Sequence, residues 1–170
     1  MRLESDEVYY PDGGVVHAGP REVHALKEAA ERNARRRSRL CAHPGPDDVL
    51  HEMLIVHDRS CYVRPHRHLG KSESLLLLEG ELDAIFFDDA GTVTERRAMA
   101  AYGGTGEFYY RIPERVWHTL VIRSPWVVFL EVTSGPFRRE QTEFAPWAPH
   151  GEDPHAVARF IDGLRAGATR

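Results

Sequence analysis

The sequence contains no long apolar run, since a stretch such as residues 75–78 is far shorter than the roughly 20 residues of a membrane-spanning helix. It also has no excess of positive charge, because 22 Lys and Arg residues against 26 Asp and Glu residues give a formal net charge of -4. Such a chain is not attracted as a whole to a phosphate backbone. We therefore expect neither a membrane protein nor a nucleic-acid-binding protein.

Lysine and cysteine are scarce. Lys27 and Lys71 are the only lysines, a bias that we attribute to genome composition. Cys41 and Cys61 lack the CxxC spacing of a redox or metal pair. The acidic residues 1–10 contain neither the basic nor the apolar region of a signal peptide. These features predict a cytoplasmic protein in which both cysteines are free thiols.

The length of 170 residues predicts a single domain, residues 1–170. Within it, residues 20–40 form a helical and arginine-rich segment, and residues 153–165 form a C-terminal helix that Asp153 can cap. Residues 50–135 contain about eight short apolar runs separated by turns: EMLIVH, CYVRPH, LLLLEG, LDAIFF, TVTERR, EFYYRI, WHTLVI and WVVFLEV. Short strands without helices between them predict a mainly β, antiparallel barrel or jelly roll with two flanking helices.

Ten histidines are many for this length, and two of them form an HxH pattern. In a strand, His66 and His68 point to the same face because side chains alternate. Glu73 follows a short turn, and a hairpin would bring its carboxylate back to the pair. An isolated HxH is also compatible with surface polarity or with a hydrogen-bonded core. Two imidazoles and a carboxylate suit one divalent ion, Zn, Fe, Mn, Ni or Co.

The spacing His66-x-His68-x4-Glu73-x6-Gly80 resembles the first motif of the cupin family. A second element, Pro113-x4-His118, is similar to that family's second motif, in which the histidine is the fourth metal ligand. The resemblance implies a cupin double-stranded β-helix with a metal bound by His66, His68, Glu73 and His118.

Further segments resemble the WbuC family of cupin-fold metalloproteins over most of residues 20–165. These segments are ARRRSR (34–39), CAH (41–43), YVRPHRH (62–68), SGPF (134–137) and FAPWAP (144–149). Members of that family are associated by gene context with O-antigen and polysaccharide synthesis. The resemblance implies a fold and a metal, and it supplies no reaction.

Strand alternation suggests further pocket residues. Tyr62 and Arg64 would share the face of His66, so Arg64 either binds an anionic substrate group or pairs with an internal acid. Glu131 is a lone carboxylate in an apolar strand, where it is either paired with an arginine or active as an acid or base.

The sequence does not decide which face of the predicted strand at residues 107–112 points into the barrel. Tyr109 and Arg111 alternate with Tyr110 and Ile112, and either set could face the cavity. We assign proton handling to Glu131, Tyr62 and Tyr109, and substrate binding to Arg64 and Arg111.

Other polar residues have simpler interpretations. We interpret the cluster at residues 32–39 as a solvated face at a helix end, with anchoring of a nucleotide-sugar as the alternative. His43 is predicted to be a hydrogen-bonded core residue. Residues 75–78 place leucine on both faces of one strand, so the outer face needs a cover. A second copy of the chain, in a homodimer, or the terminal helices would provide it.

Two functions remain open. The first is a metal-dependent cupin enzyme acting on a small polar or anionic molecule, such as a sugar or a sugar nucleotide. The second is a non-catalytic module that uses the same metal to bind or sense such a molecule. A metal-free epimerase-like cupin is disfavoured, because it would not need the four-ligand set.

Overall fold

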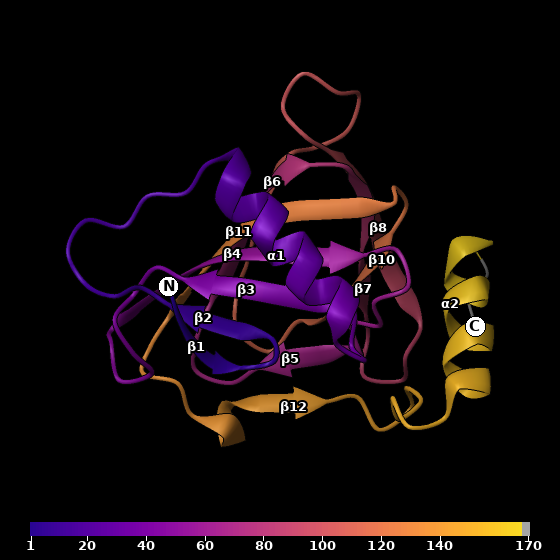
Figure 1. Ribbon diagram of the computed structural model, residues 1–170. Coiled ribbons are helices and arrows are strands. Elements are labelled where there is room, and N and C mark those ends of the chain that lie inside the picture. The colour runs from indigo at the N-terminus through magenta and orange to yellow at the C-terminus, as the bar shows by residue number, and fades with distance from the viewer. Residues whose placement is uncertain (168–170) are drawn as a thin grey trace.

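The computed structural model describes residues 1–167 as two β-sheets flanked by two helices (Figure 1). The larger sheet contains, in spatial order, β1 (Arg2–Ser5), β2 (Val8–Tyr10), β3 (Arg37–Cys41), β4 (Leu50–Asp58), β11 (Trp126–Ser134), β6 (Glu73–Glu79) and β9 (Tyr109–Ile112). The smaller sheet contains β12 (Thr142–Phe144), β5 (His66–His68), β10 (Trp117–Ile122), β7 (Glu81–Phe87) and β8 (Val93–Ala100). Neighbouring strands run antiparallel except for β2 and β3. This arrangement confirms the predicted mainly β jelly roll with two flanking helices.

The core lies between the two sheets and follows the alternation of strand side chains. On β6, Leu75 and Leu77 are buried in the interior, whereas Leu78 on the outer face is half-exposed. From the opposite sheet, Leu120 and Ile122 of β10 meet them in the same cluster. The apolar interior therefore fills one part of the barrel and supports the polar site described below.

Helix α1 (Pro20–Arg32) covers the outer face of the larger sheet over β3 and β4 (Figure 1). Pro20 suits the first helical position because it lacks the N–H that would have no partner there. The Glu22 carboxylate accepts a hydrogen bond from the Gly19 N–H at 2.9 Å. Leu26 is buried against the outward-facing Leu40 and Val56.

Helix α2 (Pro154–Arg165) covers the smaller sheet. The Asp153 carboxylate caps it by accepting a hydrogen bond from the Ala156 N–H at 2.9 Å. Leu164 is buried in the cluster that contains Ile85 and Val121. Within residues 1–167, neither helix combines the length and apolar character needed to cross a membrane.

Within the segment at residues 20–40, the helix ends at Arg32 and Arg37–Cys41 forms strand β3. The structure differs from the sequence expectation in two places. The run at residues 61–65 is irregular, and only His66–His68 pair as a strand. The short strands β1, β2 and β12 and the 3-10 turn Arg139–Gln141 were not expected, since segments this short show no period.

Candidate metal centre

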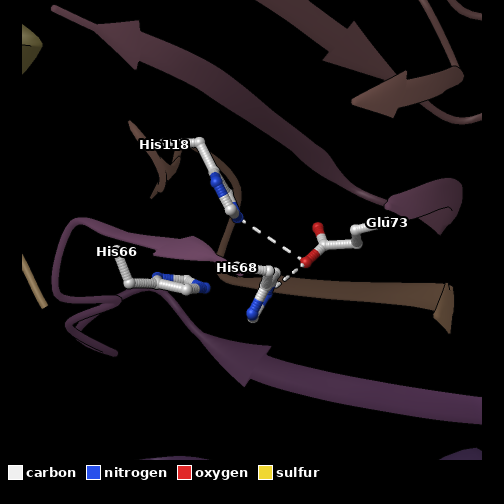
Figure 2. Close-up of side chains that lie close together, drawn as sticks. All are labelled: His66, His68, Glu73 and His118. Atoms are coloured by element: carbon white, nitrogen blue, oxygen red, sulfur yellow. Dashed lines mark hydrogen bonds and ion pairs between the residues drawn. The ribbon is translucent and has the colours of Figure 1, made fainter. Parts of the chain in front are cut away.

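Four polar side chains from both sheets converge inside the barrel (Figure 2). His66 and His68 lie on β5, and His118 on β10 is the direct cross-strand partner of His66. Glu73 opens β6 in the opposite sheet and points its carboxylate at the rings. One ligand atom from each of the four residues lies within 4.8 Å of the others.

Each imidazole is held through its Nδ1 atom. His66 Nδ1 lies 2.9 Å from the Arg64 carbonyl oxygen, and His118 Nδ1 lies 2.9 Å from the Val116 carbonyl oxygen. Because a carbonyl only accepts, Nδ1 of these two rings is the donor and Nε2 carries the lone pair. His68 Nδ1 lies 3.2 Å from the Thr142 hydroxyl of β12.

The Nε2 atoms face Glu73. His68 Nε2 is 3.0 Å and His118 Nε2 is 3.6 Å from Glu73 Oε2. His118 Nε2 is buried and has no hydrogen-bond partner within the described residues. A buried lone pair without a donor is costly, and a metal ion at the centre of the cluster would use it. The donor set therefore fits one divalent first-row ion.

Burial and the neighbouring charges shift the pKa values of three of these groups. Burial lowers the pKa of His66 to about 3, so this ring is neutral. Burial opposes the ionised form of Glu73, but the charge of His118 and the hydrogen bond of His68 lower the pKa of this carboxyl well below its usual range. Burial also opposes the charged form of His118, whose pKa the Glu73 carboxylate nevertheless raises. Glu73 is thus ionised, as a metal ligand must be.

The structure decides which face of β9 is internal. The Tyr110 hydroxyl donates a hydrogen bond to Glu73 Oε1 at 3.1 Å, and Ile112 is buried in the core. Tyr109 is half-exposed, and the Arg111 guanidinium donates to the Ser72 hydroxyl at 3.1 Å on the outside. The roles expected of Tyr109 and Arg111 therefore need correction, and Tyr110 is the β9 side chain at the cluster.

Tyr62 and Arg64 also lie away from the cluster. The Tyr62 hydroxyl donates to the Pro149 carbonyl oxygen at 3.0 Å, and burial raises the pKa of this phenol to about 12. The Arg64 guanidinium donates to the Ala145 carbonyl oxygen at 3.0 Å and to the His150 ring at 3.3 Å. Both residues fix the C-terminal segment to the barrel. Alternation failed here because residues 61–65 are not a strand.

Glu131 lies on the inner face of the barrel. Its cross-strand neighbour is Leu75, which in turn pairs with Tyr110, and both of these side chains pack in the interior. No ion pair joins Glu131 to an arginine within residues 1–167. Burial, together with the charge of Glu73, raises the pKa of Glu131 to about 8. A proton can therefore reside on this carboxyl near neutral pH.

The structure also shows the contacts of His43 and of the arginine cluster at residues 32–39. The buried His43 ring contacts the backbone of Glu52 at 3.2 Å and stacks on His51, with ring centroids 4.0 Å apart. Arg35 and Arg37 both pair with Glu7, at 3.3 and 2.8 Å. These pairs engage much of the arginine cluster within the protein.

Lys71 is a little-exposed charged residue, influenced by the charge of Glu73, that the sequence analysis did not single out. It lies in the turn between β5 and β6, and only 8% of it is exposed. A loop has no period from which its direction could be inferred. The scarcity of lysine, with two in the chain, is the one sequence feature that could have drawn attention to Lys71.

Comparison with known proteins gives the fold a context. Residues 20–99 match a family described only as a domain of unknown function, DUF6016. No curated protein matches this sequence. The cupin-fold neighbours are distant in sequence, and the chain adopts the same cupin-like jelly roll.

Three solved structures illustrate this similarity. A point mutant of oxalate decarboxylase OxdC from Bacillus subtilis matches with a TM-score of 0.50 and 15% identity, over 78% of this chain and 33% of that chain. KdgF from Halomonas sp. matches with a TM-score of 0.47 and 19% identity, over 61% and 82% of the two chains. The capsular polysaccharide assembling protein CapF from Staphylococcus aureus matches with a TM-score of 0.47 and 18% identity, over 58% and 27%. At these identities the likeness concerns the fold alone.

Proposed function

We propose that this chain is a cytoplasmic metal-dependent cupin that acts on a sugar or sugar nucleotide in surface polysaccharide (O-antigen) biosynthesis. The metal would be held by His66, His68, Glu73 and His118. The observation that carries the proposal is the convergence of these four side chains with Nδ1 of His66 and His118 fixed on carbonyl oxygens. The substrate class rests on the resemblance to the WbuC family.

A bound divalent ion would supply Lewis acidity and orient an oxygen of the ligand. The chain itself supplies proton handling through Glu131, whose pKa of about 8 lets it give or take a proton near neutral pH. Tyr110 holds Glu73 in place through its hydroxyl. The barrel wall beneath, with Leu75 and Leu77, keeps water from that side of the site.

Binding without turnover is the alternative function. The positions of Tyr62 and Tyr109 favour it, because both side chains lie away from the cluster. Within residues 1–167, Glu131 is then the one expected proton-handling residue on the inner face of the barrel. Under this alternative the same cluster binds or senses a small polar molecule.

Metal analysis of protein purified without a His tag tests the metal centre. We expect about one divalent ion per chain, and His66→Ala combined with His68→Ala should abolish it. A matched control is His43→Gln with His51→Gln, which changes another buried histidine pair outside the cluster. Stoichiometric metal in the folded first variant after chelation and reloading would refute the assignment.

A screen of sugar nucleotides with the metal-loaded protein then separates the two functions. Turnover that Glu131→Gln reduces by about 100-fold or more would support the enzyme. Saturable binding with no product would support the binding module.

A further inference from the structure

The Lys71 ammonium group occupies an unusual position beside the candidate metal centre. The side chain is 8% exposed, two residues before Glu73 in the turn that joins the two sheets. A lysine residue that is this little exposed is normally paired with an acid.

Within residues 1–167, no carboxylate oxygen lies within 4.0 Å of the Lys71 nitrogen. The nitrogen lies 5.9 Å from the centre of the Phe137 ring, at the outer limit of a cation–π contact. Such a contact is weak and does not replace an ion pair. The charge of Lys71 is therefore only partly compensated by the protein.

Nearby acids act on Lys71 through space. Burial lowers the pKa of this amine, while the charges of Glu131 and Glu73 raise it. The charge of Arg39, on β3 of the same sheet, lowers the pKa of Glu131 more than the charge of Lys71 does. Glu73 already contacts His68 and His118 and accepts a hydrogen bond from Tyr110. Within residues 1–167, neither acid therefore forms an ion pair with Lys71.

We propose that Lys71 binds the carboxylate of a small anionic ligand whose remainder lies at the candidate metal centre. This inference rests on the proposed function and narrows it to a carboxylate-bearing molecule, such as an acid sugar. The ligand carboxylate forms the ion pair that Lys71 lacks within the protein.

A carboxylate fits this position better than a phosphate. Phosphate sites generally combine several N–H donors from a helix N-terminus, a glycine-rich loop or arginine forks. Lys71 offers one ammonium group, and the ionised Glu73 would repel a doubly charged group more strongly than a singly charged one. Arg64 and Arg111 are engaged elsewhere, as described above.

The presence of only two lysines gives a direct experiment. Protein labelled with 13C-lysine should show two Cε signals, which Lys27→Arg assigns. Lys27 on α1 pairs with Glu79 at 2.5 Å and serves as the internal control. Acetate and galacturonate, neutral galactose and inorganic phosphate are then added at equal ionic strength, to metal-free and to metal-loaded protein.

We expect acetate and galacturonate to shift the Lys71 signal saturably and to leave the Lys27 signal unchanged. Galactose should shift neither signal. By calorimetry, Lys71→Met should weaken galacturonate binding by about 10-fold or more, Lys71→Arg should retain part of it, and Lys27→Met should have no effect.

Three results would overturn the inference: no saturable Lys71 shift in either form, an equal or larger shift with phosphate, or an equal loss of affinity in Lys27→Met. Metal content is measured on the same samples. A Lys71 response in protein that takes up no metal on reloading would leave this inference standing while the proposed function fails. Stoichiometric metal with a silent Lys71 would instead overturn this inference and leave the proposed metal centre standing.

Discussion

His57 shows what a buried histidine does outside the metal cluster. Its ring packs edge-on against Phe129, and its Nδ1 has no hydrogen-bond partner within the described residues. Burial lowers the pKa of His57 to about 3 from an ordinary value of 6.5. Between these two values the unfolded chain binds a proton here that the folded chain does not.

The free energy of unfolding should therefore fall as the pH drops below about 6.5. The contribution of His57 amounts to about 3 kcal/mol between pH 7 and pH 4. His57→Leu should flatten the pH dependence by that amount, as urea unfolding at several pH values would show. Parallel curves for the two proteins would contradict this assignment.

Tyr110 positions Glu73 of the candidate metal centre through its hydroxyl. Replacing it as Tyr110→Phe removes one hydrogen bond and preserves the ring, so metal affinity should fall by about 10-fold. The neighbouring Tyr109→Phe is a matched control, because that side chain faces outward. Competition with a chelator measures both affinities, and equal values for the two variants would show that Tyr110 does not support the site.

The sequence could predict the convergence of His66, His68 and Glu73 because their spacing follows strand geometry. His66 and His68 share a face whenever the segment is extended, and Glu73 needs only a short turn to return. Strand alternation did not apply to Tyr62 and Arg64, because residues 61–65 are irregular and strand pairing begins at His66. Tyr109 and Tyr110 could not be told apart, because both alternations of this strand contain a tyrosine and a plausible partner.

At the scale of elements, the turn that carries the chain from β6 in the larger sheet to β7 in the smaller sheet depends on Gly80. This residue has a φ of +85°, and a Cβ there would overlap the carbonyl oxygen of Trp126. Gly80→Ala should lower the free energy of unfolding by about 2 to 4 kcal/mol.

Gly163 in α2 is the matched control for this substitution. A Cβ at Gly163 meets no atom within 4 Å, and the residue lies inside a helix. Gly163→Ala should therefore raise the free energy of unfolding by about 0.5 to 1 kcal/mol. Urea unfolding measures both variants, and a loss of stability in Gly163→Ala would contradict this interpretation of α2.

Sequence periodicity predicted elements best where they bury an apolar face. The two helices and the longer strands β4, β6, β7, β10 and β11 have such a face. Strands β1, β2 and β12 are three or four residues long. β2 and β12 pair with strands far away in the sequence, and β1 joins the sheet only through β2. Contacts with the rest of the fold, rather than local sequence period, therefore determine where these short strands form.

At the scale of the whole molecule, part of the outer face of the larger sheet has no cover within residues 1–167. Helix α1 lies over β3 and β4, and Leu78 on β6 and Tyr109 on the edge strand β9 are each 50% exposed. Phe108 and Tyr102 extend this apolar surface, with ring centroids 5.4 Å apart.

We expect a second copy of the chain to cover this surface. A two-fold interface would place β9 of one protomer beside β9 of its partner and bury the exposed aromatic rings. Light scattering at micromolar concentration should give twice the 19.3 kDa mass of the chain, and Tyr109→Lys should give the monomer. A monomeric mass for the unchanged protein would refute the homodimer.

The position of β5 has a consequence for how the protein is made. This strand carries His66 and His68, and both strands that pair with it, β10 and β12, come later in the chain. During synthesis the HxH segment emerges from the ribosome long before either neighbour, so it keeps an unpaired edge until Thr142–Phe144 has been translated. Nascent chains that stop short of β12 would also lack the Thr142 hydroxyl beside His68. We therefore expect the candidate metal centre to be complete only after β12 has left the ribosome.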